Sequence, residues 1–257
     1  MKAPTPDFLP LSFGGGSGYA GGVKHKGIAR RAAARLIFAS LVLTLGACCI
    51  AAAAGRLGHG ARFLSLLCLV VTAVLGTVWM LFAVFTIYFF RDPEPNPPSG
   101  PGLVVSPGHG RVDAVEQITE PQFMGGSCHR ISTFLSVIDI HVQNAPVAGK
   151  IAYFKHTAGQ FLSALQAESG LRNENVLLGF ASAETPGEKI GVRLIAGVLA
   201  RRIVPFVQMG DELRRGDRIS LIQFGSRCDL YVPLHYKIKV NPGDKVVGSQ
   251  TVMAAKS

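Results

Sequence analysis

The chain reads Leu221-Ile222-Gln223-Phe224-Gly225-Ser226-Arg227-Cys228-Asp229-Leu230-Tyr231-Val232-Pro233 over residues 221–233. Two apolar runs flank the Gly225-Ser226 pair, and such runs predict two buried strands joined at a bend that glycine permits. A serine after glycine at a strand end is either part of an ordinary turn or a reactive serine held where backbone strain assists chemistry. An isolated Gly-Ser pair is more often a turn, so the surrounding sequence must decide between the two.

Short β-branched runs separated by Gly, Pro, Asn and Asp surround this stretch and fill residues 103–257. They predict strands at residues 103–105, 110–115, 130–137, 141–142, 150–154, 175–180, 189–196, 220–223 and 230–232. Helical signal is weak and limited to residues 160–167 and 198–202. Turns such as Gly210-Asp211 and Gly243-Asp244 recur before strands, in units that resemble hammerhead or barrel-sandwich folds. We therefore expect a β-rich α+β domain.

Two long uncharged apolar runs precede that domain, at residues 36–54 and 63–90. Each is long enough to cross a bilayer as a helix, and a mean hydropathy of +0.32 agrees with membrane segments. The short turn at residues 55–62 makes them a transmembrane hairpin, and aromatic residues 88–90 suit an interface belt. Residues 1–35 are expected to lack fixed structure, and residues 91–102 form a Pro-rich linker at the domain boundary.

Charge predicts how the hairpin is oriented and which partners the chain meets. More positive charge precedes the first run than lies between the two, which places the N-terminus and the β-rich domain in the cytoplasm, at an inner membrane. The net charge is +10, and many basic residues adjoin the apolar runs, which favours anionic lipid over nucleic acid. No nucleic-acid-binding motif is present. The basic residues before the first run are Lys24, Lys26, Arg30, Arg31 and Arg35.

Phe224-Gly225-Ser226-Arg227, together with its flanking strands and the lead-in Tyr88-Phe89-Phe90-Arg91-Asp92-Pro93, resembles the phosphatidylserine decarboxylase proenzymes, most closely their short subfamily. The resemblance implies that the bond between Gly225 and Ser226 breaks itself. The Ser226 hydroxyl attacks the Gly225 carbonyl, and elimination and loss of ammonia leave a pyruvoyl group at position 226. The products are a β chain of residues 1–225 and an α chain of residues 226–257. The pyruvoyl group serves as the electron sink that pyridoxal phosphate supplies elsewhere.

Two further blocks carry the same resemblance. The block Phe134-Leu135-Ser136-Val137-Ile138-Asp139-Ile140-His141-Val142-Gln143-Asn144-Ala145-Pro146-Val147-Ala148-Gly149 implies that His141 is a proton-transferring catalytic residue. Asn144 stands where the short subfamily usually has Arg. In Val105-Ser106-Pro107-Gly108-His109-Gly110-Arg111-Val112, His109 stands where the family usually has an Asp that orients the base. We therefore expect His109 to act as a base itself, with processing rewired, slowed or absent.

A last block, with Arg193-Leu194-Ile195-Ala196-Gly197 and Arg201-Arg202-Ile203-Val204, also resembles the family. It makes Arg193, Arg201 and Arg202, with Asn144, candidates for binding an anionic lipid. A solvated charged face is an equally weighted reading of the basic pair. The other histidines and the five cysteines lack metal-ligand spacing, so no metal is predicted.

These residues predict a self-processing, pyruvoyl-dependent carboxy-lyase that converts phosphatidylserine to phosphatidylethanolamine at the membrane. Its partners would be its lipid substrate, the bilayer and the two chains of one precursor, with homo-oligomerisation left open. Two alternatives stay open: a decarboxylase for another serine-headed lipid, and an unprocessed, non-catalytic lipid-binding membrane protein.

Overall fold

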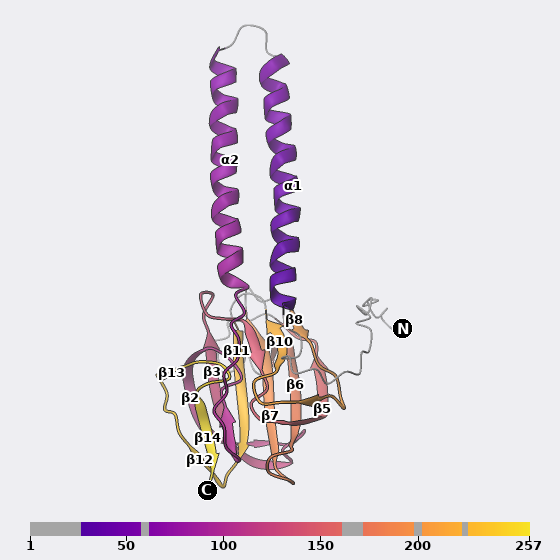
Figure 1. Cartoon of the computed structure of the whole chain (residues 1–257), viewed down its shortest axis with the longest axis vertical. Helices are drawn as coiled ribbons and strands as arrows, with labels where there is room; N and C mark the ends of the chain where they lie inside the picture. The colour runs from indigo at the N-terminus through magenta and orange to yellow at the C-terminus, as the bar shows by residue number, and fades with distance from the viewer. Residues whose placement is uncertain (1–26, 58–61, 161–171, 198–201, 223–225) are drawn as a thin grey trace.

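The computed structural model describes residues 27–57, 62–160, 172–197, 202–222 and 226–257, with the side chains of residues 54–57 and 62–65 left aside. Two helices lead the described chain, α1 (Ile28–Leu57) and α2 (Arg62–Phe89). They stand side by side as a long hairpin above the β-rich domain (Figure 1). Both are long and apolar enough to cross a membrane, over Ile28–Ala53 and Leu66–Phe89. The predicted hairpin is therefore confirmed as two apolar helices compatible with membrane association.

The first helix begins earlier than the apolar run does. Residues 28–35, which we expected to lack fixed structure, form the first turns of α1. Arg and Ala are good helix formers and no Pro or Gly interrupts them, so the helix extends through the basic segment. Within the hairpin, Trp79 Nε1 donates a hydrogen bond of 3.2 Å to Ser40 Oγ and links the two helices at mid-length.

The domain that follows is built of antiparallel strand pairs in three sheets. The main sheet has eight strands in the order β13-β2-β3-β11-β7-β6-β5-β9, and the two smaller sheets have the orders β1-β14-β12 and β4-β10-β8. In the described part of the chain the main sheet stays open, because its edge strands do not pair with each other. The strands are β1 (Leu103–Val105), β2 (Gly110–Glu120), β3 (Gly126–Leu135), β4 (Val142–Asn144), β5 (Gly149–Thr157), β6 (Asn175–Ser182), β7 (Lys189–Ala196), β8 (Ile203–Pro205), β9 (Glu212–Leu213), β10 (Arg218–Ile222), β11 (Ser226–Pro233), β12 (Tyr236–Ile238), β13 (Lys245–Val246) and β14 (Val252–Lys256).

The β-rich prediction is confirmed, and the differences lie in length. β1 and β7 have the predicted bounds, whereas β2, β3, β5, β6 and β11 are longer than expected. Strands β8, β9, β12 and β13 were not predicted, because two or three residues cannot display an alternating pattern. Nearly all of the two weak helix candidates, residues 160–167 and 198–202, lie outside the described residues.

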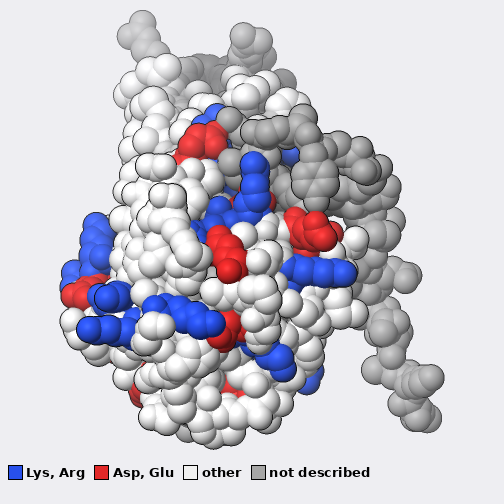
Figure 2. Space-filling model, turned by 60° about the horizontal axis from the view of Figure 1, so that its bottom comes forward, with Lys and Arg blue, Asp and Glu red and all other residues white. Residues whose placement is uncertain are grey.

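The end of the domain remote from the helices carries charges of both signs. Figure 2 shows basic side chains gathered at the left of this view, with acidic side chains among and beside them. Ion pairs such as Lys256 Nζ to Glu188 Oε1, at 2.7 Å, illustrate this mixture.

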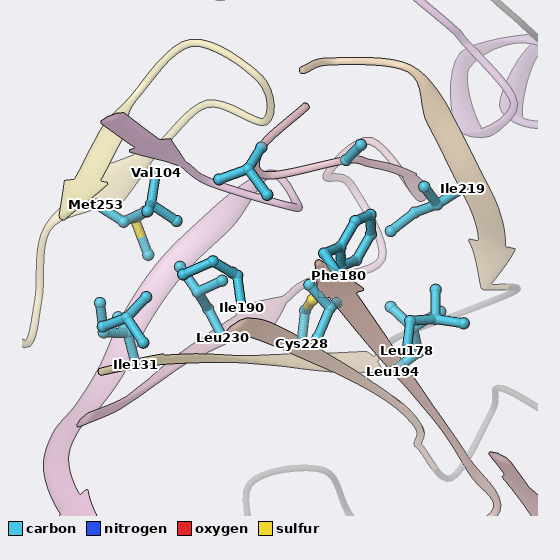
Figure 3. Close-up of a cluster of buried hydrophobic side chains, with 14 of the residues drawn as sticks. Val104, Ile131, Leu178, Phe180, Ile190, Leu194, Ile219, Cys228, Leu230 and Met253 are labelled. Carbon is cyan, nitrogen blue, oxygen red and sulfur yellow. The ribbon is translucent and has the colours of Figure 1, made fainter. Parts of the chain in front are cut away.

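The main core lies between the large sheet and the smaller ones. Its side chains come from strands far apart in the sequence, and they are buried without polar partners (Figure 3). Burial of this kind is the dominant stabilising term, at about 25 cal/mol per Å² of apolar surface. The side chains labelled in Figure 3 are Val104, Ile131, Leu178, Phe180, Ile190, Leu194, Ile219, Cys228, Leu230 and Met253.

A second apolar cluster joins the foot of the hairpin to this domain. Phe89 and Phe90 are 0% and 2% exposed and pack with Val142 and Leu221, whereas Tyr88 is 48% exposed. The expectation that all three aromatic residues face the membrane interface was therefore wrong for the two phenylalanines. Their rings are more stable in an apolar cluster shared by α1, α2, β4 and β10.

The Pro-rich segment after α2 lies bound along the β domain rather than forming a free spacer. Arg218 Nε donates to Asp92 Oδ1 at 2.6 Å, and both side chains are almost fully buried. Further along, Arg215 Nη1 and Nη2 donate to the carbonyls of Pro98 (2.6 Å) and Gly100 (2.9 Å). Two arginines from the β domain thus hold the segment, and the foot of the hairpin keeps one position over the strands.

Candidate active site

Ser226 is the first residue of β11, in the middle of the main sheet. It lies opposite Leu135 of β3 and Ala196 of β7, and its side chain is fully buried. Its Oγ has no hydrogen-bond partner in the part of the chain that the structure describes. Residues 223–225, including Gly225 of the expected cleavage site, lie outside that part. A buried hydroxyl without a partner is energetically costly, and such groups often have a catalytic role.

His141 belongs to a loop that contacts both strands flanking the expected cleavage site. The loop follows Leu135, which lies beside Ser226, and it ends at His141, whose carbonyl accepts a hydrogen bond of 3.1 Å from the Ile222 amide. Ile222 is the last residue of β10 before the expected cleavage site. The tertiary structure therefore brings the His141 loop to the end of β10 and the start of β11, although these segments are distant from it in sequence.

The His141 ring is held between an aromatic ring and a backbone carbonyl. Phe89, from the foot of α2, lies with its ring centroid 4.3 Å from that of His141 at an interplanar angle of 30°. His141 Nδ1 lies 2.9 Å from the Asp139 carbonyl, and because a carbonyl can only accept, Nδ1 is the protonated nitrogen. The Asp139 carboxylate in turn accepts hydrogen bonds from the Ser136 amide and hydroxyl.

Burial lowers the pKa of His141 from 6.5 to about 4, against the opposing influence of the Asp139 carbonyl and carboxylate. The imidazole is therefore neutral at physiological pH. With Nδ1 carrying the proton, Nε2 presents the lone pair, so His141 has the protonation state that a general base requires.

His109 lies nearby, in a small polar cavity. The preceding residue, Gly108, packs against Leu135 and Cys228, which places this segment beside the start of β11. The cavity has a volume of about 10 Å³, close to that of one water molecule. Burial, with a smaller contribution from Arg91, lowers the pKa of His109 to about 4. The cavity is lined by Asp92, Pro93, Glu94, Pro95, His109, Ile140, Val142, Asn144, Gly248, Ser249 and Gln250.

Gly248 is in close contact with the His109 ring. A methyl group at Gly248 would lie 2.8 Å from His109 Cδ2 and 3.0 Å from Nε2, closer than packed atoms allow. The turn that holds Gly248 is fixed by two backbone hydrogen bonds with Ser106, from the Ser249 amide and to the Thr251 carbonyl. Residues after the expected cleavage site therefore position a histidine that precedes it.

The three described candidates for lipid binding, Asn144, Arg193 and Arg202, do not lie together. Asn144 lines the His109 cavity, and its amide donates to the Gly216 carbonyl at 2.9 Å. Arg193 is largely buried, and its Nη2 lies 3.4 Å from Glu120 Oε1, so its described contacts stabilise the sheet. Arg202 is exposed just before β8, and Arg201 lies outside the described residues.

Several residues of the site were not identified from the sequence. Phe89 and Arg91 were noted only as part of a motif, and Asp139 only as a neighbour of His141. Arg227 was not singled out, yet it bonds Asp229 at 2.8 Å and Ser132 at 2.6 Å and fixes the strand just after Ser226. Their spacing in the sequence gives no signal, because their contacts cross between elements. Among the described residues, no group of three or more His, Cys, Asp or Glu side chains is arranged to hold a metal.

Comparison with known proteins agrees with the geometry. The family model for phosphatidylserine decarboxylase matches residues 82–254, a range that runs from the last turns of α2 into β14. The chain belongs to the phosphatidylserine decarboxylase family. Phe89, His109, His141 and Ser226 all lie inside the matched range.

Three relatives named phosphatidylserine decarboxylase proenzyme show the extent of the match. The protein from Symbiobacterium thermophilum is 44% identical over 190 residues, which cover 74% of this chain and 87% of the relative. The relative from Desulfotalea psychrophila is 38% identical over 180 residues (70% and 83%). The relative from Gluconobacter oxydans is 40% identical over 186 residues (71% and 82%). Membership of the phosphatidylserine decarboxylase family makes this chain a decarboxylase, as its motifs predicted.

Proposed function

We propose that the chain is a precursor that cleaves itself between Gly225 and Ser226 and then converts phosphatidylserine to phosphatidylethanolamine at the membrane. The observation that carries this proposal is the fully buried Ser226 hydroxyl, which has no hydrogen-bond partner among the described residues. Ser226 is the first residue of the central strand of the main sheet, and it lies beside the loop that bears the neutral His141. Family membership supports the decarboxylation of a serine-headed lipid.

The cleavage chemistry follows from groups of this chain. Ser226 Oγ bonds to the Gly225 carbonyl carbon, the C–N bond breaks, and the hydroxyl proton passes through a base to the released amine. Loss of the Ser226 Cα proton then expels the Gly225 carboxylate. Addition of water and release of ammonia leave a carbonyl at position 226. We assign the proton transfers to His141, with His109 as a second base beside the same bend.

The surroundings of Ser226 fit a group formed from its own side chain. A carbonyl in place of the hydroxyl removes a buried donor that has no partner among the described residues, so the conversion leaves no new unsatisfied hydrogen. A pyruvoyl group there supplies a carbonyl that accepts electrons when the substrate carboxylate leaves. We assign to His141 the return of a proton to the substrate carbon after that loss.

Cleavage would leave the two chains bound to each other. The α chain contributes β11, which pairs with β3 on one side and β7 on the other. It also contributes β14, which pairs with β1 of the β chain. These backbone ladders and the shared core would hold the α chain in place without a covalent link.

The membrane helices place the catalytic domain beside its substrate. A two-chain lipid rarely leaves the bilayer, so a decarboxylase anchored by a hairpin meets it at the surface. The positive charge before α1 supports a cytoplasmic domain at an inner membrane. Arg201 and Arg202 stay candidates for anionic lipid, while the contacts of Arg193 with Glu120 and of Asn144 with Gly216 favour supporting roles.

Intact-mass measurement of the purified protein tests the proposal. The wild type should give two chains, with an α chain that lacks a free amino terminus, and should release CO₂ from phosphatidylserine vesicles. Ser226→Ala should give one chain with no activity, whereas the control Ser127→Ala, at an exposed serine of β3, should behave as wild type. A single intact wild-type chain would support the unprocessed lipid-binding alternative, and His109→Asp would then show whether the family's Asp restores cleavage.

A further inference from the structure

Arg91 lies at the point where the second membrane helix ends. The candidate span runs over Leu66–Phe89, and Arg91 follows two residues later. A residue just beyond a span lies at the depth of lipid head groups. The foot of α2 meets the β domain at this level (Figure 1), so Arg91 lies between the membrane surface and the catalytic domain.

The Arg91 guanidinium is held in place without a carboxylate partner. Its Cζ lies 4.0 Å from the centroid of the Tyr88 ring, a cation–π contact. Nη1 donates to the Tyr88 carbonyl at 2.9 Å, and Nη2 donates to the Ile138 carbonyl at 2.7 Å. No acidic side chain of the described residues pairs with it, since the adjacent Asp92 is bound by Arg218. A guanidinium has five N–H donors, so the group retains its charge and further donors for a ligand.

The same guanidinium lies close to the catalytic histidines. Ile138 belongs to the loop that carries His141, so one hydrogen bond joins Arg91 to that loop. The positive charge of Arg91 also contributes to the low pKa of both His141 and His109. Beside it, Ile138 is 64% exposed and Tyr88 is 48% exposed, and both are apolar surfaces next to the membrane helices.

We propose that Arg91 binds the phosphodiester of the lipid substrate and so sets the position of its serine head group. This rests on the proposed function. An oriented, pre-fixed guanidinium suits a phosphate, which accepts two parallel N–H bonds. The acyl chains would then leave along Tyr88 and Ile138 into the bilayer. The serine would extend from the phosphate to the opposite side, toward the His141 loop and position 226.

The test compares Arg91→Gln and Arg91→Lys with wild type on phosphatidylserine vesicles and on O-methylserine, an ether that keeps the free serine carboxylate but has no phosphate. Arg91→Gln should still yield two chains but should raise the apparent KM for phosphatidylserine at least tenfold, about the loss expected for a hydrogen bond to a charged group, with a smaller change in kcat. Arg91→Lys should recover part of that loss. On the ether, the rise in KM caused by Arg91→Gln should be much smaller than on phosphatidylserine, because only the contact with the phosphate is lost for the lipid alone. The control Lys155→Gln removes an exposed charge on β5, which β6 and β7 separate from β11.

An unchanged KM for Arg91→Gln on phosphatidylserine, or an equal rise in KM on the ether, would overturn the proposal. A second measurement tests the phosphate site without requiring self-cleavage. It follows the broadening of the ³¹P signal of glycerophosphoserine when the uncleaved Ser226→Ala precursor is added. The precursor should broaden the signal, and the added Arg91→Gln change should abolish the effect, whereas inorganic phosphate should respond less. Equal broadening by both proteins would refute a phosphate site at Arg91 even if the wild type does not cleave itself. Failure of cleavage alone would count only against the proposed function.

Discussion

Replacing Asp92 by Asn should strongly destabilise the protein, because it leaves a buried arginine charge without its counter-ion. The Arg218 side chain is 1% exposed and that of Asp92 4%, and their charged atoms lie 2.6 Å apart. Glu94 is 3.8 Å from Arg218 but 55% exposed, so it can compensate little. Removing one partner of a buried ion pair costs about 3–5 kcal/mol. For a domain of this size, that corresponds to a fall in Tm of about 6–20 °C.

Thermal unfolding in detergent measures this effect. Unfolding of the β domain is followed by its near-ultraviolet signal, without relying on tryptophan, or by the signal of a bound dye. The double variant Asp92→Asn/Arg218→Met removes both charges and should recover most of the loss, since it leaves no unpaired charge buried at the site. The control Glu94→Gln should change the free energy of unfolding by about 1 kcal/mol or less. A loss below about 1 kcal/mol for Asp92→Asn, or a double variant as unstable as the sum of the single ones, would refute the reasoning.

Two further predictions concern the histidines. Because the folded protein holds His109 and His141 neutral with pKa values of about 4, the unfolded chain binds their protons first, near pH 6.5. The free energy of unfolding should therefore fall as the pH drops from about 6.5 to 4 and level off below pH 4. The cleavage rate should stay nearly constant down to about pH 5. A fall in the cleavage rate centred near pH 6.5, or a free energy of unfolding that is constant between pH 6.5 and 4, would contradict these predictions. Gly248→Ala should displace the His109 ring, slow cleavage and lower the free energy of unfolding by about 1–3 kcal/mol. The control Gly126→Ala, where a methyl group meets nothing within 4 Å, should have no such effect. Equal cleavage rates for the two variants in a gel-based time course would argue against a role for His109.

Local pattern was enough to predict several features of the fold and the site. The uncharged runs predicted both helices, and β-branched density predicted β7 with its observed bounds. The motifs around Ser226 and His141 made both residues candidates for the site, and the two lie in segments that the structure brings together. Each of these signals lies within a short window of sequence, which is why it can be read without the fold.

Features that depend on distant partners were missed or misread. Phe89 and Phe90 follow an apolar run, and only the packed structure shows that they leave the membrane face and contact β4 and β10. The linker after α2 has the composition of a spacer, yet Arg215 and Arg218 bind it through its carbonyls and through Asp92. Arg193 was chosen from a motif, and its ion pair with Glu120 appears only when β2 and β7 are placed in one domain.

The sequence by itself determined which elements form and which residues have reactive groups, because helix length, strand alternation and motif chemistry are local properties. Only the tertiary structure decided that Phe89 at the foot of α2 supplies the ring against His141 and that Arg91 supplies the charge beside it. It also decided that residues on both sides of the expected cleavage site meet around His109. The physical reason is that burial and electrostatic contact depend on distance in space, and the antiparallel sheets bring together segments that the chain separates by more than 100 residues, such as β1 with β14 and β2 with β13.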